Sequence, residues 1–170
     1  MRCFLAIDLD ENIKDKIFSL YSNLDIKGAK LVEKENLHIT LRFFGDSNEI
    51  EIIKKLKRIK MNAFEIEIHD IGAFPNERFI RVLWVGVHSK EIYELIEKIN
   101  NIFGKERFEP HITIARIKTS SHLLSEFIKK NKNVEIGKMV VRKIVLKKST
   151  LTPTGPIYEN IEEFELNDNR

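Results

Sequence analysis

The sequence has a single cysteine, Cys3, among its 170 residues, so it offers neither a disulfide framework nor a cysteine metal site. Cys3 lies within an apolar run with the character of a strand, and we expect its thiol to pack in the core. No apolar run approaches the roughly 18 residues that a membrane-spanning helix requires, and the N-terminal segment lacks the pattern of a secretory signal peptide. We therefore expect no membrane contact and a cytoplasmic protein.

The chain also lacks any low-complexity stretch or linker that would divide it. Its length and its 42% of hydrophobic residues suffice for one domain with a sizeable core, and we expect residues 1–170 to form a single soluble domain that acts as a monomer. The net charge of +3 is compatible with a polyanionic partner such as RNA but does not demand one. Basic clusters such as the one at 54–60 are typical of solvated faces.

Hydrophobic periodicity switches repeatedly between the strand and the helix pattern, which predicts an α+β fold. The clearest helix covers 90–103, because Ser89 can cap its start and Gly104 stops it. The alternation on either side of the segment Pro-Asn-Glu predicts an antiparallel pair of strands. The expected helices are 11–24, 48–59 and a shorter one around 122–130, and the expected strands are 1–9, 64–74, 78–87 and a β-rich tail from 134 onward.

The tripeptide His-Ile-Thr occurs twice, at positions 38–40 and 111–113, in segments that both have the pattern of a strand. Residues i and i+2 of a strand share one face, so each copy presents an imidazole beside a hydroxyl. Each copy is followed by a predicted helix and then by paired strands. The chain is therefore expected to consist of two similar α+β halves folded against each other, with both motifs facing one cleft.

Two histidines on opposite walls of a cleft can act as a general acid and a general base, because the imidazole pKa lies near neutrality. Thr40 and Thr113 would donate hydrogen bonds to an anion held between His38 and His111, and a phosphate fits that description. Arg116 is a further candidate for a charge-assisted contact to the phosphate. Strand parity alone would turn Arg116 to the opposite face, so a bend must bring it round.

Arg42 and Phe43 are weaker candidates for the same site. Parity puts Arg42 on the face of His38 and Thr40, although it could equally neutralise a nearby carboxylate. Phe43 could stack on a base, and at least one member of the pair Phe43 and Phe44 is expected to be core.

The remaining histidines are expected to be ordinary core or rim residues. A zinc site at the two motifs lacks a convincing third ligand, since threonine binds zinc poorly, so we expect no metal and no cofactor. The three histidines outside the motifs are His69, His88 and His122.

The segments HITLRFFG and HITIAR resemble the paired motifs of the two-histidine (2H) phosphoesterases, specifically the branch of RNA 2′,3′-cyclic phosphodiesterases once described as 2′-5′ RNA ligases. The resemblance extends to the opening strand MRCFLAIDL and to the closing segment STLTPTGPIYENIEEFEL. It implies a bilobal α+β fold, with two antiparallel-sheet lobes, outer helices and pseudo-twofold symmetry around a central cleft.

The resemblance also implies metal-independent hydrolysis of RNA 2′,3′-cyclic phosphate ends to 2′-phosphates, and ligation in the reverse direction. It implies that His38 protonates the departing 3′ oxygen, that His111 activates water, and that Thr40, Thr113 and Arg116 hold the phosphate. The residues alone do not assign the acid and the base. Two alternatives stay open: a phosphodiesterase acting on a small cyclic nucleotide or nucleotide-sugar phosphate, and an RNA-end binding module without catalysis.

Overall fold

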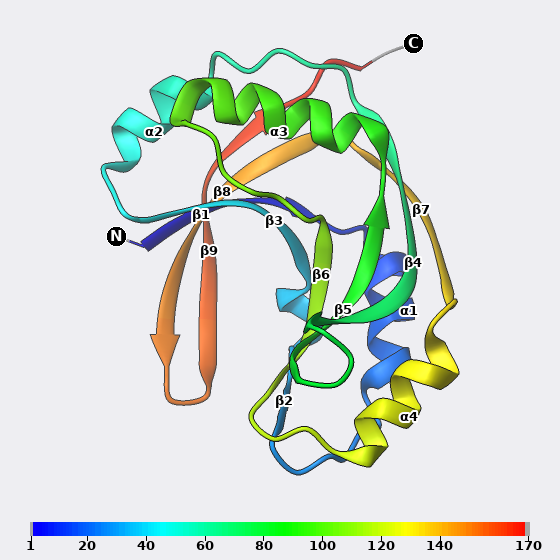
Figure 1. The fold of residues 1–170 in the computed structure, drawn as a ribbon. Coiled ribbons are helices and arrows are strands. Elements are labelled where there is room, and N and C mark those ends of the chain that lie inside the picture. The colour runs from blue at the N-terminus through cyan, green and yellow to red at the C-terminus, as the bar shows by residue number, and fades with distance from the viewer. Residues whose placement is uncertain (1, 169–170) are drawn as a thin grey trace.

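A computed structural model of the chain describes residues 2–168, and the strands within that range belong to one antiparallel sheet (Figure 1). The order across the sheet is β7-β4-β5-β6-β3-β1-β8-β9, and β2 pairs with β6. The strands are β1 (Arg2–Asp8), β2 (Ala29–Leu31), β3 (His38–Asp46), β4 (Phe64–Pro75), β5 (Ile80–His88), β6 (His111–Ile117), β7 (Glu135–Val141), β8 (Lys143–Thr152) and β9 (Gly155–Glu165).

The helices among these residues are α1 (Glu11–Tyr21), α2 (Glu49–Leu56), α3 (Lys90–Phe103) and α4 (His122–Asn131), with a short 3₁₀ turn η1 (Lys34–Asn36) before β3. The prediction for α3 is confirmed in detail, since the Ser89 hydroxyl accepts a bond from the Ile92 amide and Gly104 follows with φ +102°. Helices α1 and α2 end three residues earlier than expected. None of the helices described is long and apolar enough to cross a bilayer.

The predicted α+β fold is confirmed, but the paired strands that follow each motif do not stay in its half: β4 and β5 lie on the side of β6, and β8 and β9 lie on the side of β3. Strands β3 and β6, which carry the two His-Ile-Thr motifs, lie next to each other and pair through Ile39 and Ile112. Both isoleucines are fully buried. They belong to one core cluster, to which all four helices contribute side chains.

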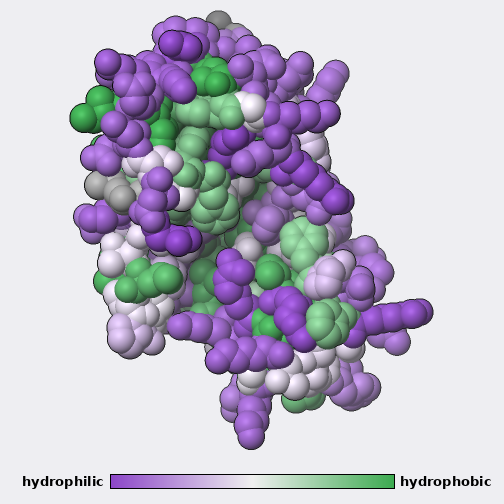
Figure 2. All heavy atoms as spheres, turned by 60° about the vertical axis from the view of Figure 1, so that its left-hand side comes forward, coloured by the Kyte–Doolittle hydropathy of each residue, from purple (hydrophilic) through white to green (hydrophobic). Residues whose placement is uncertain are grey.

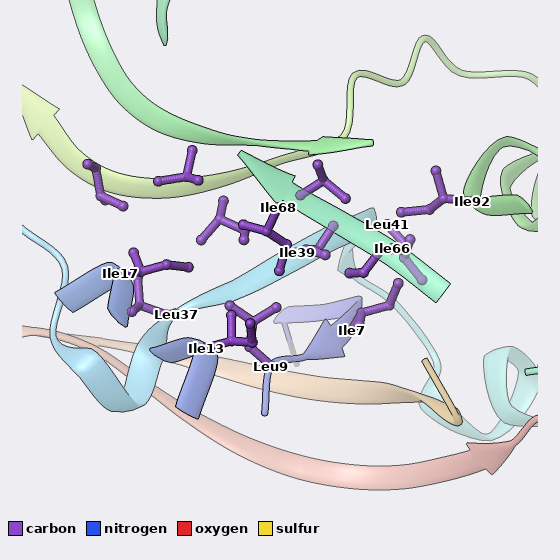
Figure 3. Close-up of a cluster of buried hydrophobic side chains, with 14 of the residues drawn as sticks. Ile7, Leu9, Ile13, Ile17, Leu37, Ile39, Leu41, Ile66, Ile68 and Ile92 are labelled. Carbon is purple, nitrogen blue, oxygen red and sulfur yellow. The ribbon is translucent and has the colours of Figure 1, made fainter. Parts of the chain in front are cut away.

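The core lies on the helix-covered side of the sheet. Figure 3 shows Ile13 and Ile17 of α1 beside Leu37 and Ile39, with side chains of β1 and β4 completing the cluster. Cys3 is 1% exposed, as expected of a packing residue. Since Ile39 and Ile112 face the helices, their sequence neighbours on β3 and β6 must face the opposite side, which leaves that side free for a cleft.

Candidate active site

The two His-Ile-Thr motifs meet around the Ile39–Ile112 pair. In an antiparallel register centred on that pair, His38 lies opposite Thr113 and Thr40 lies opposite His111. Directly opposed residues share one face of a sheet, so two imidazoles and two hydroxyls converge with approximate twofold symmetry. The structure therefore brings together the four side chains that the sequence had placed in one cleft.

A cleft with a volume of about 150 Å³ covers this group. Figure 2 shows the side of the molecule where the β8–β9 hairpin lies, with a hollow between its upper and lower parts. The residues that line the cleft are Lys30, Leu31, Val32, Glu33, Asn36, His38, Thr40, Phe43, His111, Thr113, Arg116, Thr154, Gly155, Pro156 and Tyr158. The predicted residues are all among them except Arg42.

Both catalytic candidates are held by the backbone carbonyl two residues before them. Nδ1 of His38 lies 2.7 Å from the carbonyl oxygen of Asn36, and Nδ1 of His111 lies 2.7 Å from that of Glu109. A carbonyl oxygen only accepts, so Nδ1 must carry the proton in both rings. In the neutral rings Nε2 is then unprotonated and can accept a hydrogen bond. Nε2 of His38 accepts one from the Thr40 hydroxyl at 2.9 Å.

The His38 ring packs against two aromatic side chains. Its centroid lies 5.2 Å from that of Phe4 and 5.3 Å from that of Tyr158. The rings of His111 and Phe74 are nearly perpendicular, with their centroids 5.0 Å apart. These contacts restrict ring rotation beyond what the Nδ1 bonds achieve, so each Nε2 is held in a fixed direction.

Burial is the main reason why the pKa of His38 lies below its ordinary value. The charge of Lys147 and the imidazole of His111 lower this pKa further, whereas the bond to the Asn36 carbonyl and the carboxylate of Asp8 raise it. Lys147 is itself buried, with its Nζ 2.9 Å from Asp8 Oδ1 and 2.7 Å from Asn160 Oδ1. The free site thus favours a neutral His38.

A bulge in β6 explains how Arg116 reaches the cleft. Thr113 pairs with Trp84, but Ala115 pairs with Leu83, so Ile114 is an extra residue in β6. One extra residue reverses strand parity, and Arg116 comes to the face of His111 and Thr113. This bulge is the bend that the expected position of Arg116 required.

The same irregularity occurs in β3, with the opposite consequence for Arg42. Thr40 pairs with Ala6 and Arg42 with Leu5, so Leu41 is the extra residue. The parity prediction for Arg42 is therefore wrong, and Phe43 takes the place on the cleft face that Arg116 has in the other half. The Phe43 side chain is 65% exposed and available to a ligand.

Arg42 instead holds the C-terminal end of α3. Its guanidinium donates to the carbonyl oxygens of Gly104 at 2.7 Å and Phe103 at 3.0 Å and to Oδ1 of Asn100 at 3.3 Å, and it lies 3.5 Å from the Glu106 carboxylate. The last carbonyls of a helix lack internal partners, and a cation at that end also meets the favourable end of the helix dipole. Arg42 is a structural residue.

Sequence reasoning missed Tyr158 and Lys30. Tyr158 comes from β9, and burial raises its pKa while the nearby charge of Arg116 lowers it. Lys30 lies in β2, a strand of three residues that is too short to show a period. Nδ2 of Asn36 donates a 3.3 Å hydrogen bond to the Pro156 carbonyl oxygen. This bond links the β8–β9 hairpin to the residue whose carbonyl holds the His38 ring.

Comparison with known proteins separates the two His-Ile-Thr motifs into two segments of the chain. A family model described as LigT-like phosphoesterase matches the chain twice, over residues 7–84 and 85–158. The chain belongs to the LigT-like phosphoesterase family. Each matched segment of this LigT-like chain contains one His-Ile-Thr motif. The family resemblance indicated by the sequence is confirmed.

Relatives of this LigT-like phosphoesterase cover nearly the whole chain. It is 44% identical to a protein of Methanocaldococcus jannaschii named RNA 2′,3′-cyclic phosphodiesterase, with 96% of this chain and all of that protein aligned. Its fold superimposes on the TT0787 protein of Thermus thermophilus with a TM-score of 0.84, 26% identity and complete coverage of both chains. Escherichia coli LigT complexed with phosphate matches with a TM-score of 0.78, 25% identity and 98% of each chain covered.

Proposed function

We propose that this protein hydrolyses RNA 2′,3′-cyclic phosphodiester ends to 2′-phosphomonoesters, with His38 and His111 as its acid and base. The observation that carries the proposal is the convergence of both His-Ile-Thr motifs on one cleft. Full-length relatives that are named RNA 2′,3′-cyclic phosphodiesterase support the substrate class. The phosphate in the E. coli LigT structure supports an anion as the ligand of this fold.

In the proposed reaction, water attacks the cyclic phosphorus while Nε2 of His111 takes its proton. The bond between phosphorus and the 3′ oxygen breaks, and Nε2 of protonated His38 gives its proton to that oxygen. The products are a 2′-phosphomonoester and a free 3′-hydroxyl. Solvent then returns His111 to its neutral and His38 to its protonated form, which completes the proton balance.

Thr40, Thr113 and Arg116 hold the phosphate in this proposal. The two hydroxyls donate from the same face of β3 and β6, and the guanidinium supplies a charge-assisted bond to a non-bridging oxygen. The exposed ring of Phe43 and the ring of Tyr158 offer faces on which the terminal base can stack.

The neutral state that burial favours for His38 must change before it can donate a proton. A bound phosphate supplies the negative charge that favours the imidazolium, and the Nδ1–H bond to the Asn36 carbonyl also favours it. As the departing 3′ oxygen takes up negative charge, His38 gives it the proton and returns to the neutral form that burial favours.

The proposed chemistry needs no metal ion, because two imidazoles transfer the protons and Arg116 offsets the phosphate charge. By microscopic reversibility, the same groups catalyse 2′-5′ ligation when a 5′-hydroxyl replaces water. We also propose that the whole chain works as a single bilobal domain, as a monomer, in the cytoplasm. Sedimentation of the pure protein tests the oligomeric state.

The test uses an oligonucleotide 2′,3′-cyclic phosphate and its analogue with sulfur in place of the bridging 3′ oxygen. His38→Ala and His111→Ala should each lower kcat on the oxygen substrate at least about 100-fold. A thiolate leaves without a proton, so His38→Ala should regain activity on the sulfur analogue and His111→Ala should not. His122→Ala changes an exposed histidine outside the cleft and serves as the control. Equal behaviour of the two variants would overturn the assigned roles.

A further inference from the structure

A second cluster of titratable side chains lies outside the cleft, on strands β4 and β5. Nδ1 of His69 is 2.9 Å from Oδ2 of Asp70, and Nε2 of His88 is 3.4 Å from the same oxygen. One potential ligand atom from each of the three residues lies within 4.8 Å of the others. The sequence had suggested that both histidines are ordinary core or rim residues, and the fold brings them together.

A bulge in β4 builds this cluster. Ile68 pairs with Val87 and Ile71 with Val85, so His69 and Asp70 together oppose the single residue Gly86. Asp70 adopts φ +73°, a left-handed conformation that is uncommon for a residue other than glycine. Bulges of this kind redirect side chains and are frequent near functional sites. Here the bulge directs the side chains of His69 and Asp70 toward His88.

Gly86 provides the space that the cluster needs. A Cβ atom at this position would lie 2.6 Å from the carbonyl oxygen of His69 and 3.0 Å from Nε2 of His88. A side chain at residue 86 would therefore push the bulge and the His88 ring apart. The absence of a side chain at Gly86 lets two imidazoles and a carboxylate approach one another.

Two imidazole nitrogens and one carboxylate oxygen form a donor set that first-row transition metals prefer, whereas Mg²⁺ and Ca²⁺ prefer oxygen donors alone. The two rings are stacked with centroids 3.7 Å apart and planes 11° apart. Lone pairs lie in the ring plane, so one ring must turn about its Cβ–Cγ bond for both nitrogens to meet one ion. The His69 and His88 side chains are 24% and 46% exposed, which leaves room for that rotation.

We propose that His69, Asp70 and His88 bind a divalent first-row transition metal ion, of the class of Zn²⁺, Ni²⁺ or Cu²⁺. Water fills the remaining coordination positions on the exposed side. Glu67 lies beside the other ring nitrogen of His69, with its Oε2 3.9 Å from Nε2, and pairs with His88 in the register, so it adds negative charge close to the ion. None of these four residues lines the cleft, so the ion takes no part in the proposed hydrolysis.

Trp84, the single tryptophan of the chain, is a natural reporter for this site. A Cβ atom at Gly86 would lie 3.6 Å from Cζ3 of Trp84 and 3.0 Å from Nε2 of His88, so the indole and the His88 ring flank the same point. Paramagnetic Ni²⁺ and Cu²⁺ quench the fluorescence of a nearby indole. Binding at the cluster should therefore be visible without any label.

The experiment titrates the full-length, metal-free protein with Ni²⁺ alone and follows Trp84 fluorescence, with calorimetry giving the stoichiometry. We expect one ion per chain and saturable quenching that Mg²⁺ in excess does not reverse. His88→Gln should weaken binding at least about tenfold, given that even outer partners of metal ligands contribute that much. His122→Gln is the matched control, because the exposed His122 side chain pairs with Glu126 at 3.0 Å and is not part of the cluster, and it should bind like the wild type.

A double variant, His38→Ala with His111→Ala, separates the cluster from the cleft and should retain the quenching. The proposal is overturned if the wild type binds no Ni²⁺, if His88→Gln binds with unchanged affinity while its circular dichroism shows a folded protein, or if the double variant loses binding. His88→Gln should hydrolyse a cyclic-phosphate substrate in EDTA as fast as the wild type. Loss of catalysis and loss of metal binding are thereby measured independently.

Discussion

Replacing Arg116 with methionine tests the bulge that brings this side chain into the cleft. Methionine keeps much of the length and the apolar stem but removes the charge and the hydrogen-bond donors. A hydrogen bond to a charged group contributes about 1.5–3 kcal/mol. At 1.36 kcal/mol for each factor of ten, Arg116→Met should lower kcat/KM for a cyclic-phosphate oligonucleotide by about 10-fold to 150-fold.

Arg42→Met is the matched control, since strand parity alone would have put Arg42 in the cleft instead. Its guanidinium donates three hydrogen bonds at the end of α3, and its side chain is 10% exposed. At a net contribution of about 1 kcal/mol for each bond, with one bond as long as 3.3 Å, we expect a loss of about 2 kcal/mol of stability. For a chain of this size the melting temperature should fall by about 4–8 °C.

Both variants are assayed at 25 °C, where a loss of about 2 kcal/mol leaves an ordinary domain folded. Initial rates give kcat/KM, and thermal unfolding followed by circular dichroism gives the stability. Arg116→Met should lose activity and keep its melting temperature, and Arg42→Met should do the reverse. If Arg42→Met lost activity as severely as Arg116→Met while still folded, the parity argument from the two bulges would be refuted.

Four further predictions concern protonation, metal ions and the central core. Because burial lowers the pKa of His38, NMR titration of the free protein should place the pKa of this imidazole below its ordinary value, and a value above the ordinary one would contradict the reasoning. Lys147→Gln removes a charge that lowers this pKa, so the NMR titration of His38 should move to higher pH, and a downward shift would contradict the reasoning. EDTA at millimolar concentration should leave the hydrolysis rate unchanged, whereas a loss of hydrolytic activity in EDTA would show that a metal ion is required. Ile112→Ala, at a fully buried position between the two halves, should cost about 2–5 kcal/mol in chemical denaturation, and a loss below about 1 kcal/mol would contradict the packing described for the centre of the sheet.

The sequence was sufficient to predict the architecture because its signals were local and periodic. The helix after Ser89 was predicted from its cap, its apolar stripe and its terminal glycine, and the structure agrees at both ends. The repeated His-Ile-Thr motif also predicted two similar halves, and the family model does match twice, but the paired strands that follow each motif join the side of the sheet that carries the other motif. A period of two along β3 and β6 then placed the imidazoles and hydroxyls on a single face.

Strand parity failed where an extra residue enters a strand. Nothing in the segment around Leu41 marks a bulge, so Arg42 was placed on the wrong face and Phe43 was ranked too low. Bulges depend on pairing with a distant partner strand, which a single sequence does not display. The sequence analysis placed Arg116 in the cleft only by assuming a bend in the strand, which its expected contact with the phosphate required.

Long-range contacts account for the other omissions. Tyr158 reaches the cleft because β9 folds back along β8, and Lys30 arrives on a strand too short to have a pattern. The approach of His69 and His88 depends on the bulge at Asp70 and on the missing side chain of Gly86. Each of these placements follows from tertiary pairing and not from local propensity.

The most direct test of the two-histidine mechanism is the position of the phosphate in the product. Wild-type protein is incubated in EDTA with an oligonucleotide that ends in a 2′,3′-cyclic phosphate, and ³¹P NMR identifies the phosphomonoester that forms. A 2′-phosphate produced at a rate that His38→Ala and His111→Ala each abolish is the predicted result. A 3′-phosphate, or an intact cyclic end after prolonged incubation, would contradict the proposed mechanism.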